Sequence, residues 1–192
     1  LAGTLADTYT GNVTLNDANG TGIAGADITT IEAATNGTIT VSNNINITGT
    51  AAQVAAAVDD VNTFSGDATA TLSNAHTLAE LKAINNKLSG ILTLNDYTVA
   101  LSGSAADIAA ALAGSFADTY TGNITITDAD EANVNATDIN TIASGTSGTI
   151  TISNNVDING TAAAVATAVA NVDTYTKAAV TATLSNAHTL AQ

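Results

Sequence analysis

The chain of 192 residues has no cysteine, proline, methionine or tryptophan, and only three of its residues are Lys or Arg. The lack of cysteine excludes disulfide bonds and thiolate metal sites. Seventeen acidic residues bring the net charge to −14, which disfavours nucleic acid as a partner because its phosphates would be repelled. No segment approaches the roughly 18 consecutive apolar residues of a transmembrane helix. The sequence therefore predicts neither nucleic-acid binding nor membrane insertion.

Small and polar residues dominate the composition. The sequence contains 40 alanines, 34 threonines and 21 asparagines, against 43 residues of the types Leu, Ile, Val and Phe. These bulky core-forming types make up just over a fifth of the chain, close to the level below which charged chains stay disordered. We therefore expect a thin, narrow core.

A short aromatic motif recurs along the chain. Its aromatic residues, Tyr9, Phe64, Tyr120 and Tyr175, are separated by 55, 56 and 55 residues. A longer period is superimposed, because residues 1–12 match residues 112–123 at all but two positions. Such periods are typical of repeat proteins, and we expect a window on a longer array. The predicted boundaries are 1–10 (end of a preceding repeat), 11–66, 67–122 and 123–177 (repeat units) and 178–192 (start of a further repeat), with pairs repeating every ~111 residues.

Each repeat combines strand and helix patterns. Alternating residues, as in Thr38–Ser42, predict short half-buried strands. The segments Thr50–Gln53 and Thr77–Glu80 have the capping-box pattern of a helix start, and Ser104 is a further N-cap candidate. The apolar stripes expected on these helices are Val54, Val58 and Val61, then Leu78, Leu81 and Ile84, then Ile108, Leu112 and Phe116.

One such strand-and-helix piece cannot bury its apolar face alone, whereas stacked pieces can. The predicted fold class is therefore an α/β repeat solenoid, in which short stacked strands alternate with short Ala-rich helices. A right-handed parallel β-helix is the alternative, because runs of Thr, Asn, Gly and Ile fit that fold as well. Only the capping boxes favour helices over it.

Two sets of residues are candidate sites. Calcium prefers carboxylate, amide and carbonyl oxygens, and the densest group of these residues predicts calcium ligands at Asp128, Asp130, Glu131 and Asp138. A solvated acidic loop is the alternative for this group, since its spacing is not that of an EF-hand. If equivalent residues stack, the recurring aromatics form a structural ladder of Tyr9, Phe64, Tyr120 and Tyr175.

No motif indicates catalysis. Gly20–Gly25 reads G-x-G-x-x-G, but the corresponding residues 131–136 contain no glycine, so we interpret this motif as a loop. His76 and His188 occupy equivalent positions without a second histidine nearby, which is a poor transition-metal site. We therefore expect no catalytic residue and no enzyme activity, and calcium is the sole candidate cofactor.

Residues 71–84 and 99–112 carry a family resemblance. The first reads TLSNAHTLAELKAI and the second VALSGSAADIAAAL. Both resemble the Ala/Thr/Asn/Asp-rich tandem repeats of very large bacterial, cyanobacterial-type, cell-surface or secreted proteins. The resemblance implies export, great length and a structural or adhesive role, and it carries over no functional residue.

These patterns favour a non-enzymatic, extracellular structural protein. Its coils are expected to stack end to end and coil on coil into a self-assembling fibre, sheath or surface-layer element, so the expected partners are copies of itself. The alternative is a calcium-dependent adhesin stalk that presents a binding domain outside these residues. A location outside the cell or on its surface is expected for both.

Overall fold

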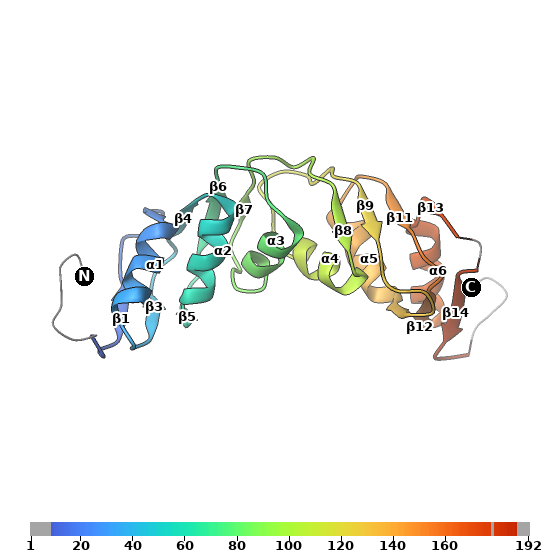
Figure 1. Cartoon of the computed structure of the whole chain (residues 1–192), viewed down its shortest axis with the longest axis horizontal. Coiled ribbons are helices and arrows are strands. Elements are labelled where there is room, and N and C mark those ends of the chain that lie inside the picture. Colours follow the sequence, from blue (N-terminus) through green and yellow to red (C-terminus); the bar gives the residue numbers. More distant parts are fainter. Residues whose placement is uncertain (1–8, 178, 188–192) are drawn as a thin grey trace. The chain divides into compact units, whose positions relative to one another are not determined.

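The fold consists of short strands that alternate with short helices. The computed structural model describes residues 9–177 and 179–187 (Figure 1). The strand pairings within these residues are parallel. The chain is therefore an α/β fold, as the strand and helix patterns predict, and not the all-β alternative.

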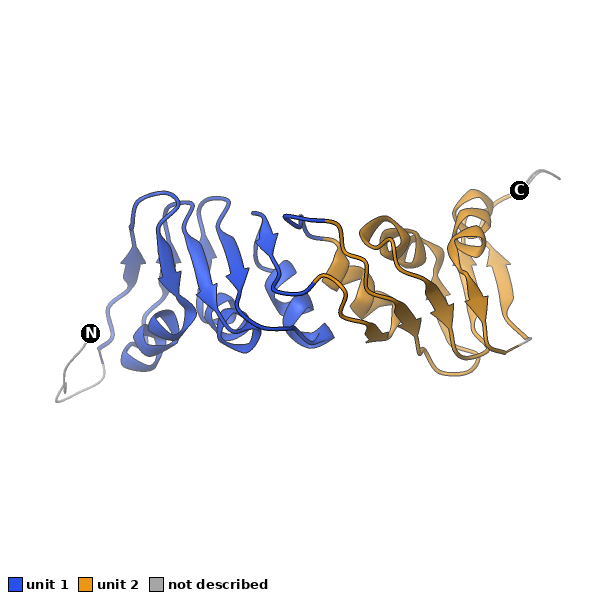
Figure 2. Cartoon of the chain, turned by 90° about the horizontal axis from the view of Figure 1, so that it is seen from above, with its two compact units in different colours: residues 1–96, 114–118 blue, residues 97–113, 119–192 orange. Residues whose placement is uncertain are grey.

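The chain divides into two compact units (Figure 2). Unit 1 comprises Leu1–Asp96 and Gly114–Asp118, and unit 2 comprises Tyr97–Ala113 and Thr119–Gln192. Within each unit the strands lie side by side, with the helices along one side of them (Figure 2).

Unit 1 has two parallel sheets and a row of helices. The sheets have the strand orders β1-β3-β5 and β2-β4-β6-β7, and α2 contacts both α1 and α3. Each of the first three strand–strand–helix segments thus gives one strand to each sheet and one helix to the row. The elements are β1 (Val13–Leu15), β2 (Gly22–Ala24), α1 (Gly25–Ala34), β3 (Ile39–Val41), β4 (Asn46–Gly49), α2 (Ala51–Asp60), β5 (Thr63–Phe64), β6 (Thr69–Leu72), α3 (Leu78–Asn85) and β7 (Leu92–Thr93).

Unit 2 is arranged in the same way. Its sheets have the orders β8-β9-β11-β13 and β10-β12-β14, and α5 contacts both α4 and α6. The elements are β8 (Leu101–Gly103), α4 (Ala105–Leu112), β9 (Ile124–Ile126), β10 (Asn133–Asn135), α5 (Ala136–Gly145), β11 (Ile150–Ile152), β12 (Asp157–Gly160), α6 (Ala162–Asn171), β13 (Thr174–Tyr175) and β14 (Thr181–Leu184).

Paired strands are about one segment apart in the sequence. Val13 lies opposite Ile39, and the next strand of that sheet pairs Thr40 with Thr63. Parallel pairing of this kind requires a crossover between strands, which the helices supply. Because side chains alternate along a strand, Ile39 and Val41 enter the core while Thr40 points outward.

The core is a narrow layer between the sheets and the helices. In unit 1 it contains Ile47 of β4 and Val54 and Ala57 of α2, none of which is exposed. Alanine at such positions lets a helix approach the strands closely. Tyr120 is the largest fully buried side chain of the described residues.

Three helices begin where the capping patterns at Thr50, Thr77 and Ser104 predict. Thr50 and Gln53 form a capping box at α2, and Thr77 and Glu80 form one at α3. Ser104 accepts a hydrogen bond from the amide of Asp107 at the start of α4. The described helices have eight or ten residues, and none of them is long and apolar enough to cross a membrane.

The position predicted for Phe116 is wrong. It was expected on the apolar stripe of the helix that follows Ser104, but α4 ends at Leu112 and Phe116 pairs with Leu92 in an isolated parallel bridge. The intervening Gly114 has a low helix propensity, so the helix stops before the stripe continues.

Candidate functional site

Asparagine and aspartate side chains join successive segments. The carboxamide oxygen of Asn12 accepts a hydrogen bond from the amide of Thr38 at 3.0 Å, and that of Asn62 accepts one from the amide of Ile39 at 2.7 Å. In unit 2 the carboxylate of Asp173 accepts from the amide of Ile150, also at 2.7 Å. Each bond links residues 23–26 positions apart. The side chains therefore extend the strand hydrogen bonding from one segment to the next.

The helix starts are also capped from the following segment. The first amides of α2, α4 and α6 donate to Asn74, Asp128 and Asn186 respectively, at 2.7, 2.8 and 2.7 Å. These amides have no partner within their own helices. The first amides of these three helices thus depend on the segment that follows each helix.

A row of hydroxyl groups crosses the outer face of one sheet in each unit. In unit 1 the strand register aligns Thr14, Thr40 and Thr63. In unit 2 it aligns Ser102, Thr125, Thr151 and Thr174. Adjacent strands lie about 4.8 Å apart, so neighbouring hydroxyl groups of a row are separated by about that distance. Within residues 9–177 and 179–187, none of these Thr and Ser hydroxyl groups makes a hydrogen bond.

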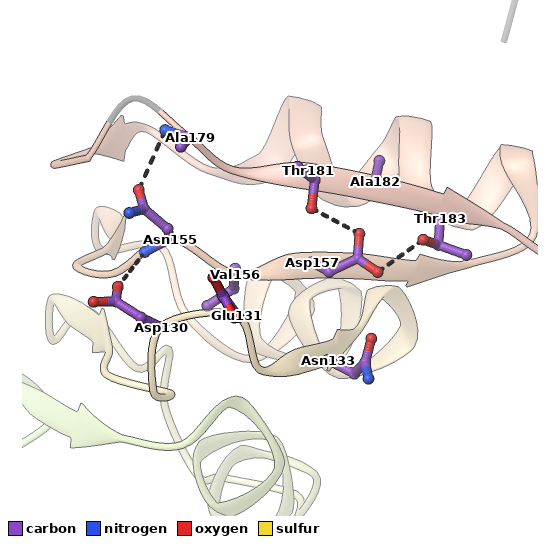
Figure 3. A pocket seen from close by; sticks show the side chains of 10 residues that line it. All are labelled: Asp130, Glu131, Asn133, Asn155, Val156, Asp157, Ala179, Thr181, Ala182 and Thr183. Carbon is purple, nitrogen blue, oxygen red and sulfur yellow. Dashed lines mark hydrogen bonds between the residues drawn. The ribbon is translucent and has the colours of Figure 1, made fainter.

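The second sheet of unit 2 borders a polar depression of about 530 Å³ (Figure 3). The carboxylate of Asp157 on β12 accepts hydrogen bonds from Thr181 and Thr183 on β14, at 3.0 and 2.8 Å. At the other end, Asp130 accepts from the amide of Asn155 at 2.9 Å. The equivalent of Asp157 in unit 1 is Asn46, which also bonds to two threonines.

The structure uses the candidate calcium ligands in separate ways. Asp128 caps α4, whereas Asp130 forms an ion pair with Lys177, whose Nζ lies 3.0 Å from its carboxylate. The hydrogen bond from Asn155, followed by that from Lys177, lowers the pKa of Asp130. Asp138 lies in the first turn of α5, where burial and then the charge of Asp128 raise its pKa.

Glu131 occupies a turn with a φ of 64°, and its equivalent in unit 1, Gly20, has a φ of 78°. Glycine adopts this left-handed conformation without strain, so the G-x-G-x-x-G motif is explained here by a turn. No group of three or more His, Asp or Glu residues able to hold a metal ion occurs in the part of the chain that the structure describes. Calcium at residues 128–138 remains a prediction.

Two of the four aromatic residues, Tyr9 and Tyr120, lie outside the named strands, and the other two lie within strands. Tyr9 pairs with Thr35 and is 43% exposed, while Tyr120 is 1% exposed and its hydroxyl donates to Val99 O at 2.6 Å. Phe64 and Tyr175 are in β5 and β13, where they lie opposite Val41 and Ile152. The register does not place the two aromatics of either unit opposite each other.

One of the two histidines is buried. His76 is 3% exposed and directly precedes the N-cap of α3. Burial lowers its pKa, and the carboxylates of Asp96 and Glu80 oppose this effect. The predicted equivalent, His188, lies outside the described residues. This burial was not evident from the sequence, because His76 follows a polar turn.

The last described segment of unit 2 exposes apolar side chains. Val169 of α6 is 44% exposed and Leu184 of β14 is 38% exposed. Together with Tyr175, Val180 and Ala182 they form a surface that we call the open edge, next to a hollow of about 400 Å³. Burial of the Tyr175 side chain raises its pKa.

No family model, curated protein or solved structure matches the chain.

Proposed function

We propose that this chain is a non-enzymatic, extracellular structural repeat protein. Its strand–strand–helix segments are the successive coils of an α/β solenoid, and such arrays form a self-assembling fibre, sheath or surface-layer element. The observation that supports this proposal is the recurrence of the same hydrogen bonds from coil to coil. Asn12 and Asn123 each bind a backbone amide 26 residues further along, at 3.0 Å in both units.

Stacking is the mechanism. A coil presents backbone amides that the Asn, Asp or Thr side chains of the next coil can satisfy, together with apolar side chains that the next coil can cover. Each added coil therefore gains hydrogen bonds and buried apolar area of the same kind, which is the energetic basis of a repeat array. The net charge of −14 keeps such an array hydrated and disfavours unspecific aggregation.

The extracellular location is supported by the resemblance of residues 71–84 and 99–112 to repeats of large secreted and cell-surface proteins. The composition fits this setting, because three Lys and no Arg leave few cleavage sites for trypsin-like proteases. Copies of the same chain are the proposed partners.

Negative-stain electron microscopy of the purified chain, before and after addition of a chelator, tests the proposal. We expect long uniform filaments that survive chelation. Separate particles under all conditions would contradict self-assembly. Rods that collapse when calcium is removed would favour the alternative, a calcium-dependent adhesin stalk.

A further inference from the structure

We propose that the hydroxyl rows on the outer face of one sheet in each unit bind ice, by taking the places of water molecules in its surface. This inference goes beyond the proposed function and does not depend on self-assembly. The rows are Thr14, Thr40 and Thr63 in unit 1 and Ser102, Thr125, Thr151 and Thr174 in unit 2.

The strand register gives each row one member on every strand of its sheet. Thr40 lies opposite both Thr14 and Thr63, and Thr151 lies opposite both Thr125 and Thr174. All members are exposed or half-buried, and six of the seven are threonine. Because the side chain of threonine is branched at Cβ, its χ1 angle is restricted. The hydroxyl groups of a row are therefore held in place before any ligand binds.

The hydroxyl groups of the rows are free, whereas threonines of the other sheet of unit 1 are not. On that sheet Thr48 donates a hydrogen bond to the carbonyl of Ile23 at 3.3 Å, and Thr71 accepts one from the carboxamide of Asn46 at 3.1 Å. Within residues 9–177 and 179–187 no row member has such a bond. The donor and acceptor positions of the rows are thus left for solvent.

The spacing of the rows is close to that of oxygen atoms in ice. Two water molecules that bind a common neighbour in tetrahedral geometry have oxygens about 4.5 Å apart, because each O–H···O distance is about 2.8 Å. Row members on adjacent strands are about 4.8 Å apart. Over the four strands of unit 2 the difference adds up to about 0.9 Å, which is well below the length of one hydrogen bond. Each hydroxyl group can therefore replace one oxygen of the lattice.

The surroundings of the rows carry no charge, although the chain has 17 acidic residues. The positions two residues before and after each row member, which point to the same face of a regular strand, are also uncharged. An ordered water lattice is thus not disturbed there by the hydration shell of an ion. A glycan is a poorer occupant, because the rows offer no aromatic ring on which a sugar could stack. A second copy of the chain is poorer as well, because the rows offer little apolar area to bury.

The test grows ice slowly from a dilute solution of the purified chain and measures the protein in the ice and in the remaining liquid. We expect the parent chain to be enriched in the ice, where a free dye is excluded. The variant with Thr40→Lys and Thr151→Lys should lose this enrichment, because each row then carries a strongly hydrated charge. Equal enrichment of this variant and the parent would overturn the inference, as would exclusion of the parent.

A matched control places the same charges on the helices. Thr30 of α1 and Thr141 of α5 donate to the carbonyls of Ala26 and Thr137, and Thr30→Lys with Thr141→Lys should leave the enrichment unchanged. The isosteric variant with Thr40→Val and Thr151→Val keeps the β-branched shape that strands favour. It should lower the enrichment while the unfolding midpoint, followed by circular dichroism, stays the same.

The controls also distinguish this inference from the proposed function. Passive trapping of filaments in ice would enrich the parent, the row variants and the helix variant alike, and would overturn the inference while self-assembly stands. Enrichment of the parent alone and the helix variant, with separate particles in electron microscopy, would support the inference while self-assembly fails. Retention of the parent on insoluble cellulose without enrichment in ice would assign the rows to a glycan and overturn the inference.

Discussion

At the scale of single residues, the high asparagine and threonine content has a structural explanation. Asn62 and Asp173 are exposed, yet each accepts a hydrogen bond from a backbone amide of the preceding segment at 2.7 Å. An acceptor at this position satisfies an amide at the edge of a short strand. The two residue types are interchangeable here because both present an oxygen in the same place.

This equivalence predicts the effect of substitutions at Asn62. Replacement by leucine should lower the free energy of unfolding by about 1–2 kcal/mol, because the amide of Ile39 loses its partner. Replacement by aspartate, the residue used at position 173, should change it by less than about 0.5 kcal/mol. Urea unfolding of the three proteins measures both values. Equal losses for leucine and aspartate would argue against the proposed hydrogen bond.

The buried His76 predicts a pH dependence of stability. Its pKa is lowered in the folded chain, so the unfolded chain binds the proton more readily. The favourable contribution of neutral His76 is complete above the unfolded pKa of about 6.5 and is lost as the pH falls below it.

The comparison for this prediction is His76→Gln. Between pH 7.5 and 5, the unfolding free energy of the parent should fall more steeply than that of the variant. The sign follows because Asp96 and Glu80 oppose the burial effect without cancelling it. Parallel pH profiles would show that His76 ionises with equal ease in both states.

At the scale of elements, the helices depend on side chains at their starts. At α2, Thr50 accepts from the amide of Gln53 at 3.3 Å, and Gln53 accepts in return from the amide of Thr50 at 3.0 Å. Asn74 of the following segment binds the amide of Ala51. A ten-residue helix is marginal in isolation, so these caps contribute to its position as well as its stability.

We therefore expect Thr50→Ala to lower the free energy of unfolding by about 1 kcal/mol. The control is Thr50→Ser, which keeps the hydroxyl oxygen and should lose only a few tenths of a kcal/mol. Thermal unfolding followed by circular dichroism at a helix wavelength measures both. A loss for serine as large as that for alanine would indicate that the methyl group, and not the cap, is important.

The helices show which of their features sequence patterns can predict. The capping boxes at Thr50 and Thr77 predicted two helix starts correctly, because those interactions are local. The stripe through Phe116 failed, because Gly114 ends the helix and pairing with Leu92 places the aromatic ring elsewhere. Among the candidate site residues, the partners of Asp128 and Asp130 lie 23 or more residues away, and no local pattern identifies them.

At the scale of the whole chain, two strands of identical sequence, β6 and β14, have different environments. The strand sequence Thr-Ala-Thr-Leu is covered in unit 1 and open in unit 2. A leucine at the end of this strand contributes to stability in proportion to the apolar area that its neighbours remove from water.

Substitution of the two leucines makes this difference measurable. Leu72→Ala should lower the free energy of unfolding of unit 1 by about 2–5 kcal/mol, because it leaves a cavity. Leu184→Ala should lower that of unit 2 by less than about 1 kcal/mol, because the side chain is already exposed. Hydrogen exchange resolved to each unit distinguishes the two effects. Equal losses would indicate that Leu184 is buried in solution, as it would be within a filament.

The sequence alone determined the local features of this protein: the short alternating strands, the helix caps, the periods of about 55 and 111 residues and the acidic surface. The strands, the caps and the acidic surface depend on residues within a few positions of one another or on composition, and the periods depend on matches between distant segments of the sequence. The tertiary structure decided which Asn or Asp side chain satisfies which backbone amide, and that His76 is buried. Those outcomes depend on neighbours one segment away, whose contacts exist only once the chain has folded.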